Sequence, residues 1–135
     1  MNKVGIVIYK NEIYYCVINN KLLIDIGMLT FNNESPTLIS DFNNLFEELV
    51  TKYKPSTLSF KVPLNISKLY QYRYMYYPLG VLILVCENHD ITCIERSSSW
   101  INSKNGYKIE EVKRVFQTQK FNEKSIQSVV LAYFD

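Results

Sequence analysis

The chain of 135 residues is poor in histidine, glycine and cysteine, and each scarcity excludes a class of site. A single histidine, His89, excludes a metal centre built from several imidazoles, and we interpret it as a surface residue. Four glycines, with no GxGxxG or Walker A pattern, argue against a loop that cradles phosphate. The three cysteines are far apart and follow no signal peptide, which is typical of reduced thiols in a cytosolic protein.

Long hydrophobic runs and strong charge are also missing. No apolar stretch is long enough to cross a bilayer, so we expect a cytoplasmic protein without a membrane partner. A net charge of +2 is too small to indicate nucleic-acid binding by itself. The length fits a single domain over residues 1–135, with a core that needs neither metal nor disulfide.

Tyrosine is abundant, and β-branched and aromatic residues dominate the first thirty positions, where two polar turns interrupt them. Three antiparallel strands are therefore predicted, at residues 3–9, 12–19 and 21–28. A helix follows from Asp41 to Val50 or beyond, because apolar residues recur there at helical spacing. Its predicted cap is Ser40 or Asp41.

Strands and helices alternate in the rest of the chain. Two further strands are predicted, at residues 57–62 and 90–95. The helical stretch from Ser67 to about Cys86 contains Pro78, which either kinks one helix or lies in the first turn of a second. The remaining helices are predicted near Trp100, at residues 108–117 and after the cap residue Asn122. This order predicts an α/β protein with a mixed sheet and helices on both faces.

The order of elements resembles the RNase H-like fold, and more specifically the RuvC-type Holliday junction resolvases. Residues 3–18 (KVGIVIYKNEIYYCVI) resemble the first hairpin of small uncharacterised bacterial proteins with this fold. Three other stretches resemble its central strand, a resolvase segment and its closing helix, namely residues 54–62, 94–117 and 123–134. The resemblance covers nearly the whole chain and implies a nuclease in which carboxylates hold two divalent metal ions.

Acidic residues are missing where this resemblance places the metal ligands. The first acid falls on Val7 and the second on Val62, and neither side chain can bind a metal ion. On the closing helix the matching positions are Lys124, Ser125 and Ser128. Because Glu123 is the only acid nearby, we expect a pseudo-nuclease that holds no metal and acts by binding. The alternative is an active Mg²⁺-dependent, structure-selective nuclease with displaced ligands, of which Glu123 would be one.

A tyrosine-rich segment, Lys68 to Tyr77, is the first candidate for the binding surface. A helix that is aromatic on most sides cannot bury every ring in so small a domain. It is either a core helix with exposed tyrosine tips or a surface for a protein partner, including a second copy of the chain. Base stacking is a third interpretation. The predicted contact residues are Tyr70, Arg73, Tyr74 and Tyr77.

A basic segment is the candidate surface for nucleic acid, through Lys104, Lys108, Lys113, Arg114 and Lys120. Binding to phosphate would require these side chains on one face, yet Lys113 and Arg114 diverge by one helical step. Two neighbouring glutamates dilute the positive charge, so a solvated helix face is the favoured interpretation. We therefore expect a protein partner or homodimer first and nucleic acid second. The abundance of Asn, Lys, Ile and Tyr indicates an AT-rich genome, such as that of a bacterium or its phage.

Overall fold

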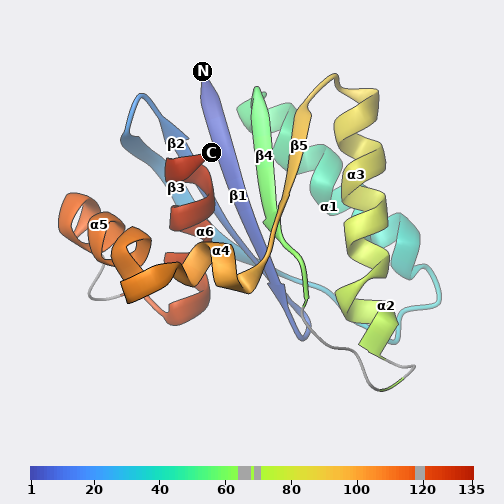
Figure 1. Cartoon of the computed structure of the whole chain (residues 1–135). Coiled ribbons are helices and arrows are strands. Elements are labelled where there is room, and N and C mark those ends of the chain that lie inside the picture. Colours follow the sequence, from blue (N-terminus) through green and yellow to red (C-terminus); the bar gives the residue numbers. More distant parts are fainter. Residues whose placement is uncertain (64–67, 69–70, 118–120) are drawn as a thin grey trace.

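The computed structural model describes residues 1–63, 68, 71–117 and 121–135, excluding the side chain of Lys104. Its centre is a five-stranded sheet in the order β3–β2–β1–β4–β5 (Figure 1). The strands are β1 (Asn2–Tyr9), β2 (Glu12–Asn19), β3 (Leu22–Thr30), β4 (Thr57–Lys61) and β5 (Thr92–Arg96). β1, β2 and β3 are antiparallel, whereas β4 and β5 run parallel to β1. The predicted mixed sheet is confirmed.

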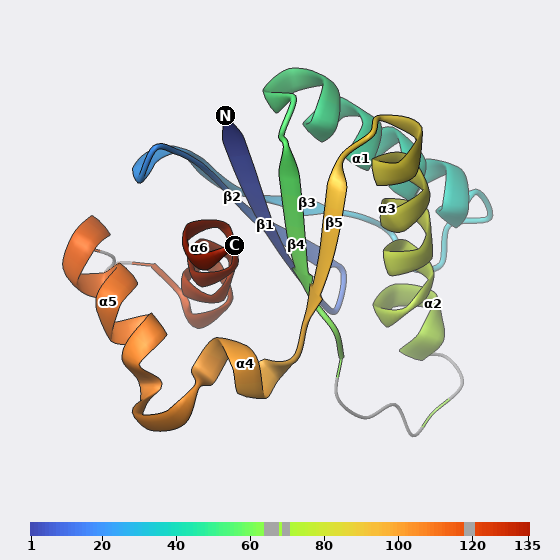
Figure 2. The same cartoon turned by 45° about the horizontal axis from the view of Figure 1, so that its top comes forward.

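Helices cover both faces of the sheet, as predicted (Figure 2). One face carries α1 (Leu38–Tyr53), α2 (Gln71–Met75) and α3 (Tyr77–Asn88). The other face carries α6 (Glu123–Phe134), against which α5 (Tyr107–Phe116) packs. Two short helices, α4 (Ser98–Asn102) and η1 (Lys104–Gly106), connect β5 to α5. No helix in the described ranges is long and apolar enough to span a bilayer.

The central strand β1 is buried on both faces, which explains its unbroken apolar sequence. Val4 and Ile6 point into the hydrophobic core beneath α1 and α3, whereas Val7 points into the core beneath α6. At Gly5 the backbone of α6 rests on the strand, because an added Cβ would lie 2.1 Å from the carbonyl oxygen of Ser128. Glycine is therefore required at this crossing, and the contact fixes the height of α6 above β1.

The start of α1 differs from the prediction. The helix begins at Leu38, so the predicted cap at Ser40 or Asp41 is wrong. Thr37 precedes the helix, and its Oγ1 donates to Asp41 Oδ1 over 3.0 Å. Asp41 lies in the first turn instead, where a negative charge interacts favourably with the helix dipole.

Two other local predictions are confirmed. Pro78 lies in the first turn of α3, which is the second of its two predicted placements. Asn122 caps α6, because its Oδ1 accepts the backbone N–H of Ser125 over 2.8 Å. The predicted start of the Ser67–Cys86 helix falls partly on residues outside the described ranges.

Replacing Gly5 by alanine should destabilise the protein by about 2 kcal/mol or more, because the new Cβ would force α6 away from the sheet. Urea unfolding followed by circular dichroism measures the change. Gly80→Ala in α3 is the matched control, since its Cβ would meet no atom within 4 Å. That variant should gain roughly 0.4–1 kcal/mol. Equal stability of the two variants would contradict the proposed crossing of α6 over Gly5.

Candidate functional site

Val7 marks the centre of the site that the fold resemblance predicts. Its side chain is 1% exposed and belongs to the hydrophobic cluster between the sheet and α6, together with Val129 and Val130. An apolar side chain in a dry contact offers no oxygen to a hard cation such as Mg²⁺. The position of the first expected acid is therefore part of the core.

Lys61, the last residue of β4, lies on the same face of the sheet as Val7. The parallel ladder ends where Ile6 pairs with Phe60, the residues directly before Val7 and Lys61. The Lys61 side chain points to the α6 face, where its Nζ donates to Gln127 Oε1 over 3.3 Å. The residue of β4 that shares a face with Val7 is thus a cation.

Val62 does not join Val7, contrary to the prediction that placed the second missing acid there. Its side chain packs against the core beneath α1 and α3, and its backbone N–H donates to the Arg96 carbonyl oxygen over 2.9 Å. Consecutive residues of an extended chain point to opposite faces, so Lys61 and Val62 cannot both face α6. Lys61, and not Val62, therefore lies where the second acid was expected to face α6.

The first turns of α6 supply the remaining side chains of the site. Gln127, which is 3% exposed, accepts from Lys61 and donates through Nε2 to Glu123 Oε1 over 3.5 Å. The Nζ of Lys124 lies 4.6 Å from the ring centroid of Tyr9, the last residue of β1. We call these five residues the lysine cluster: Tyr9, Lys61, Glu123, Lys124 and Gln127.

The two serines predicted at ligand positions of α6 serve the helix itself. Ser125 contributes its backbone N–H to the Asn122 cap. Ser128 is fully buried, and its Oγ donates to the carbonyl oxygen of Ser125 over 2.6 Å. Of the three predicted positions on this helix, Lys124 is the one whose side chain joins Lys61.

The lysine cluster holds more positive than negative charge. Burial lowers the pKa of the Lys61 ammonium below its usual value of 10.5, and the charge of Lys124 lowers it further. Glu123 acts in the opposite direction, which favours the charged form of Lys61. Nowhere in the described part of the chain do three or more His, Cys, Asp or Glu side chains group as metal ligands. The residues at this site do not fit a divalent metal, and their charge favours an anion.

The basic segment is not a continuous cationic face. Lys108 is 7% exposed, and its Nζ donates to the Trp100 carbonyl oxygen over 2.9 Å while lying 3.6 Å from the Trp100 ring centroid. Arg96 lies 4.3 Å from the centroid of the same ring. Trp100 therefore packs in contact with two cations, and Lys108 is withdrawn from the surface.

Two other basic residues predicted for nucleic acid, Lys113 and Arg114, lie further along α5. Arg114 is exposed and pairs with Glu111 on its own helix, with Nη2 and Oε1 2.6 Å apart. Lys113 is half-buried on the same helix. Lys120 and the side chain of Lys104 lie outside the described residues.

The tyrosine-rich segment combines core and surface positions. Tyr74 packs against the core beneath α1 and α3, whereas Tyr77 is 45% exposed. Arg73 is exposed, and its Nε donates to the Asn33 carbonyl oxygen over 3.3 Å. Arg73 and Tyr77 line a hollow of about 300 Å³ with residues 35–40. The fourth predicted contact, Tyr70, lies outside the described residues.

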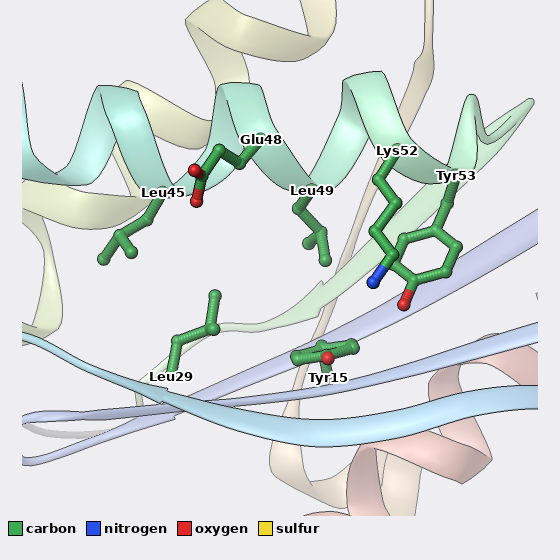
Figure 3. Close-up of a pocket in the computed structure, with 7 residues that line it drawn as sticks. All are labelled: Tyr15, Leu29, Leu45, Glu48, Leu49, Lys52 and Tyr53. Atoms are coloured by element: carbon green, nitrogen blue, oxygen red, sulfur yellow. The ribbon is translucent and has the colours of Figure 1, made fainter.

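A separate pocket of about 390 Å³ lies between α1 and the sheet, on the face opposite the lysine cluster (Figure 3). Leu45 and Leu49 of α1 point toward Leu29 of β3, and Glu48 and Lys52 bring opposite charges. Two tyrosines complete the lining of this pocket, Tyr15 and Tyr53.

Both tyrosine hydroxyls of this pocket donate to Asp25 Oδ2 on β3. Burial and the bond to Asp25 raise the pKa of Tyr53 above its usual value of 10, so this phenol keeps donating well into the alkaline range. The hydroxyls thus stabilise the packing of α1 on β2 and β3.

Comparison with solved structures identifies the fold. The protein superposes on Thermus thermophilus RuvC in complex with a Holliday junction substrate with a TM-score of 0.81 at 9% identity, covering 98% of this chain and 90% of RuvC. A second structure of that RuvC gives 0.76 at 10% identity, covering 98% and 91%. The fold is that of the RuvC-type resolvases.

A more distant RuvC-like neighbour supports the same conclusion. The yeast mitochondrial Holliday junction resolvase gives a TM-score of 0.69 at 13% identity, covering 96% of this chain and 75% of the resolvase. No protein-family model and no curated protein sequence matches the chain. At these identities the likeness shows the fold alone, so the function has to be argued from the site.

Sequence reasoning missed three members of the lysine cluster, namely Lys61, Gln127 and Tyr9. The alternation along the strand predicted at 57–62 carried a signal for Lys61, because residues 57, 59 and 61 must share a face. Gln127 is four residues after Glu123, the helical spacing at which side chains meet. Tyr9 carried no signal of its own, since its role depends on where α6 crosses β1.

The free energy of unfolding of wild type should rise relative to that of Lys61→Met as pH approaches 10.5. The lowered pKa means that folded Lys61 loses its proton before the unfolded chain does, so wild-type stability rises with pH over that window relative to Met. Urea unfolding of both proteins at neutral and alkaline pH measures the difference. A constant difference across this range would show that folding does not perturb Lys61.

Proposed function

We propose that this chain is a RuvC-like domain that binds nucleic acid without cutting it. The observation that carries the proposal is that an apolar Val7 and a cationic Lys61 share the face of the sheet beneath α6, which itself carries Lys124. Two-metal cleavage of a phosphodiester requires carboxylates that hold the ions. Ammonium groups at this site repel divalent cations and attract the phosphate backbone instead.

Two observations favour nucleic acid over other anions. The RuvC structure with the highest similarity reported above was determined with a Holliday junction substrate, and the present chain matches it over nearly its whole length. The positive side chains of the lysine cluster come from β4 and α6, so the fold itself brings them together. Nucleic-acid binding at this site depends on salt, because each contacted phosphate releases counterions.

The test is incubation with a four-way junction, a flayed duplex and single-stranded DNA in the presence of Mg²⁺ or Mn²⁺. We expect no cleavage product and a gel shift that weakens as salt is raised, with an authentic RuvC as the positive control for cutting. Glu123→Gln should leave the lack of cleavage unchanged. Metal-dependent cutting that Glu123→Gln abolishes would overturn the proposal and establish a nuclease with displaced ligands.

A protein partner, in the form of a second copy of the chain, is the second candidate function. It is favoured by the exposed rings of Tyr72 and Tyr77 and by the hollow beside Arg73. Tyrosine and arginine are enriched in the energetically dominant parts of interfaces. This surface belongs to α2 and α3, on the face of the sheet opposite the lysine cluster, so the two functions are compatible.

If this surface forms a homodimer, Tyr77→Ala should weaken it by about tenfold or more, as expected for an aromatic residue at an interface centre. Sedimentation analysis over a range of protein concentrations measures the dissociation constant. Tyr107→Ala is the matched control, because Tyr107 is also an exposed tyrosine but lies on α5. A monomeric mass for wild type at every concentration would rule out the homodimer.

A further inference from the structure

The lysine cluster contains two ammonium groups whose mutual repulsion is only partly compensated. Lys61 donates a hydrogen bond to Gln127 of α6, and Glu123 and Lys124 lie one helical turn before Gln127 on the same helix. In line with this placement, Lys124 lowers the pKa of Lys61 and Glu123 raises it. Glu123 is shared, because it also accepts from Gln127. Two neighbouring cations are stabilised when an anion lies between them, and a phosphate group supplies the charge and acceptor oxygens for this.

Lys61 is held in position before any ligand arrives. Gln127, whose side chain is almost entirely buried, accepts one of the three N–H bonds that a lysine ammonium can donate. A ligand that meets a fixed ammonium group loses less conformational entropy on binding than one that has to order a free lysine. The buried amide therefore acts as a support for the cation.

An aromatic ring lies beside Lys124 of the lysine cluster. Tyr9 is 41% exposed, with Lys124 Nζ 4.6 Å and Lys10 Nζ 5.4 Å from its ring centroid. Sites for single-stranded nucleic acid combine these two features, because rings stack on bases while lysines bind the backbone. A base inside a duplex is already stacked on both faces, so an unpaired nucleotide is the one that can use the ring.

We propose that Lys61 and Lys124 together bind one backbone phosphate of an unpaired nucleic-acid strand, and that the adjacent base stacks on Tyr9. This inference rests on the proposed nucleic-acid-binding function and assigns its point of contact. The two ammonium groups provide the positive charge at the RuvC-like site, so binding requires no divalent metal. The basic segment is a weaker candidate, because Lys108 is buried and Arg114 is paired with Glu111.

The experiment is fluorescence anisotropy with a labelled oligothymidine in EDTA, measured for wild type, Lys61→Met, Lys124→Gln and Tyr9→Ala. Each lysine variant should weaken binding by about five- to 30-fold at low salt and reduce the slope of log affinity against log salt by about 1. Tyr9→Ala should weaken binding by roughly five- to 100-fold, whereas Tyr9→Phe should retain it. Circular dichroism and urea unfolding establish that each variant is folded.

Lys113→Gln on α5 is the matched control, because it makes the same change in net charge outside the lysine cluster. It should bind within about twofold of wild type, and a loss at Lys113 without a loss at Lys61 or Lys124 would overturn the assignment. If wild type binds no oligonucleotide, the proposed function fails as well. If wild type binds and both lysine variants bind equally well, the proposed function stands and this inference fails.

A titration with inorganic phosphate, compared with chloride at the same ionic strength, distinguishes a nucleic-acid ligand from a free small anion. Free phosphate should displace the oligothymidine only at concentrations far above that of competing unlabelled oligothymidine, because free phosphate can use the two lysines but not Tyr9. Displacement by phosphate at a concentration similar to that of the unlabelled oligothymidine would assign the site to a small anion and overturn the nucleic-acid interpretation. A fully paired duplex should bind more weakly than oligothymidine, and equal binding would overturn the stacking role of Tyr9.

Discussion

The crossing of α6 over β1 at Gly5 determines which side chains meet in the lysine cluster. Because there is no room for a Cβ at Gly5, the helix backbone lies against the strand at a single height. The first turns of α6 are then held over the carboxyl end of the strand, where Lys124 meets Tyr9 and Gln127 meets Lys61. A larger residue at the crossing would raise the helix and separate the two lysines from each other.

The architecture could be predicted from the sequence because its signals are local. Alternating strands, polar turns and helical spacing give the order of elements, and Asn122 has the side chain that an N-terminal cap requires. The start of α1 was misjudged because Asp41 is suitable both as a cap and as a residue of the first turn. Such a choice depends on how the preceding loop packs, which a local pattern does not contain.

The site was less predictable, because its membership depends on register between segments far apart in the sequence. A shift of one residue exchanged Val62 for Lys61, which turned an apolar position into a charged one. The burial of Lys108 in the basic segment could not be predicted for a related reason. Five cations close together in sequence gave no indication that Lys108 would be buried against Trp100, because that contact requires the turn between α4 and α5.

The neighbourhood of Val7 and Lys61 also constrains how this site could evolve. An acid introduced at Val7 would share the α6 face of the sheet with the Lys61 ammonium, and ion pairing between the two groups would compete with metal binding. Removing Lys61 first would leave Gln127 buried without one of its partners. Neither single substitution creates a metal site, so several changes together would be needed to build one here.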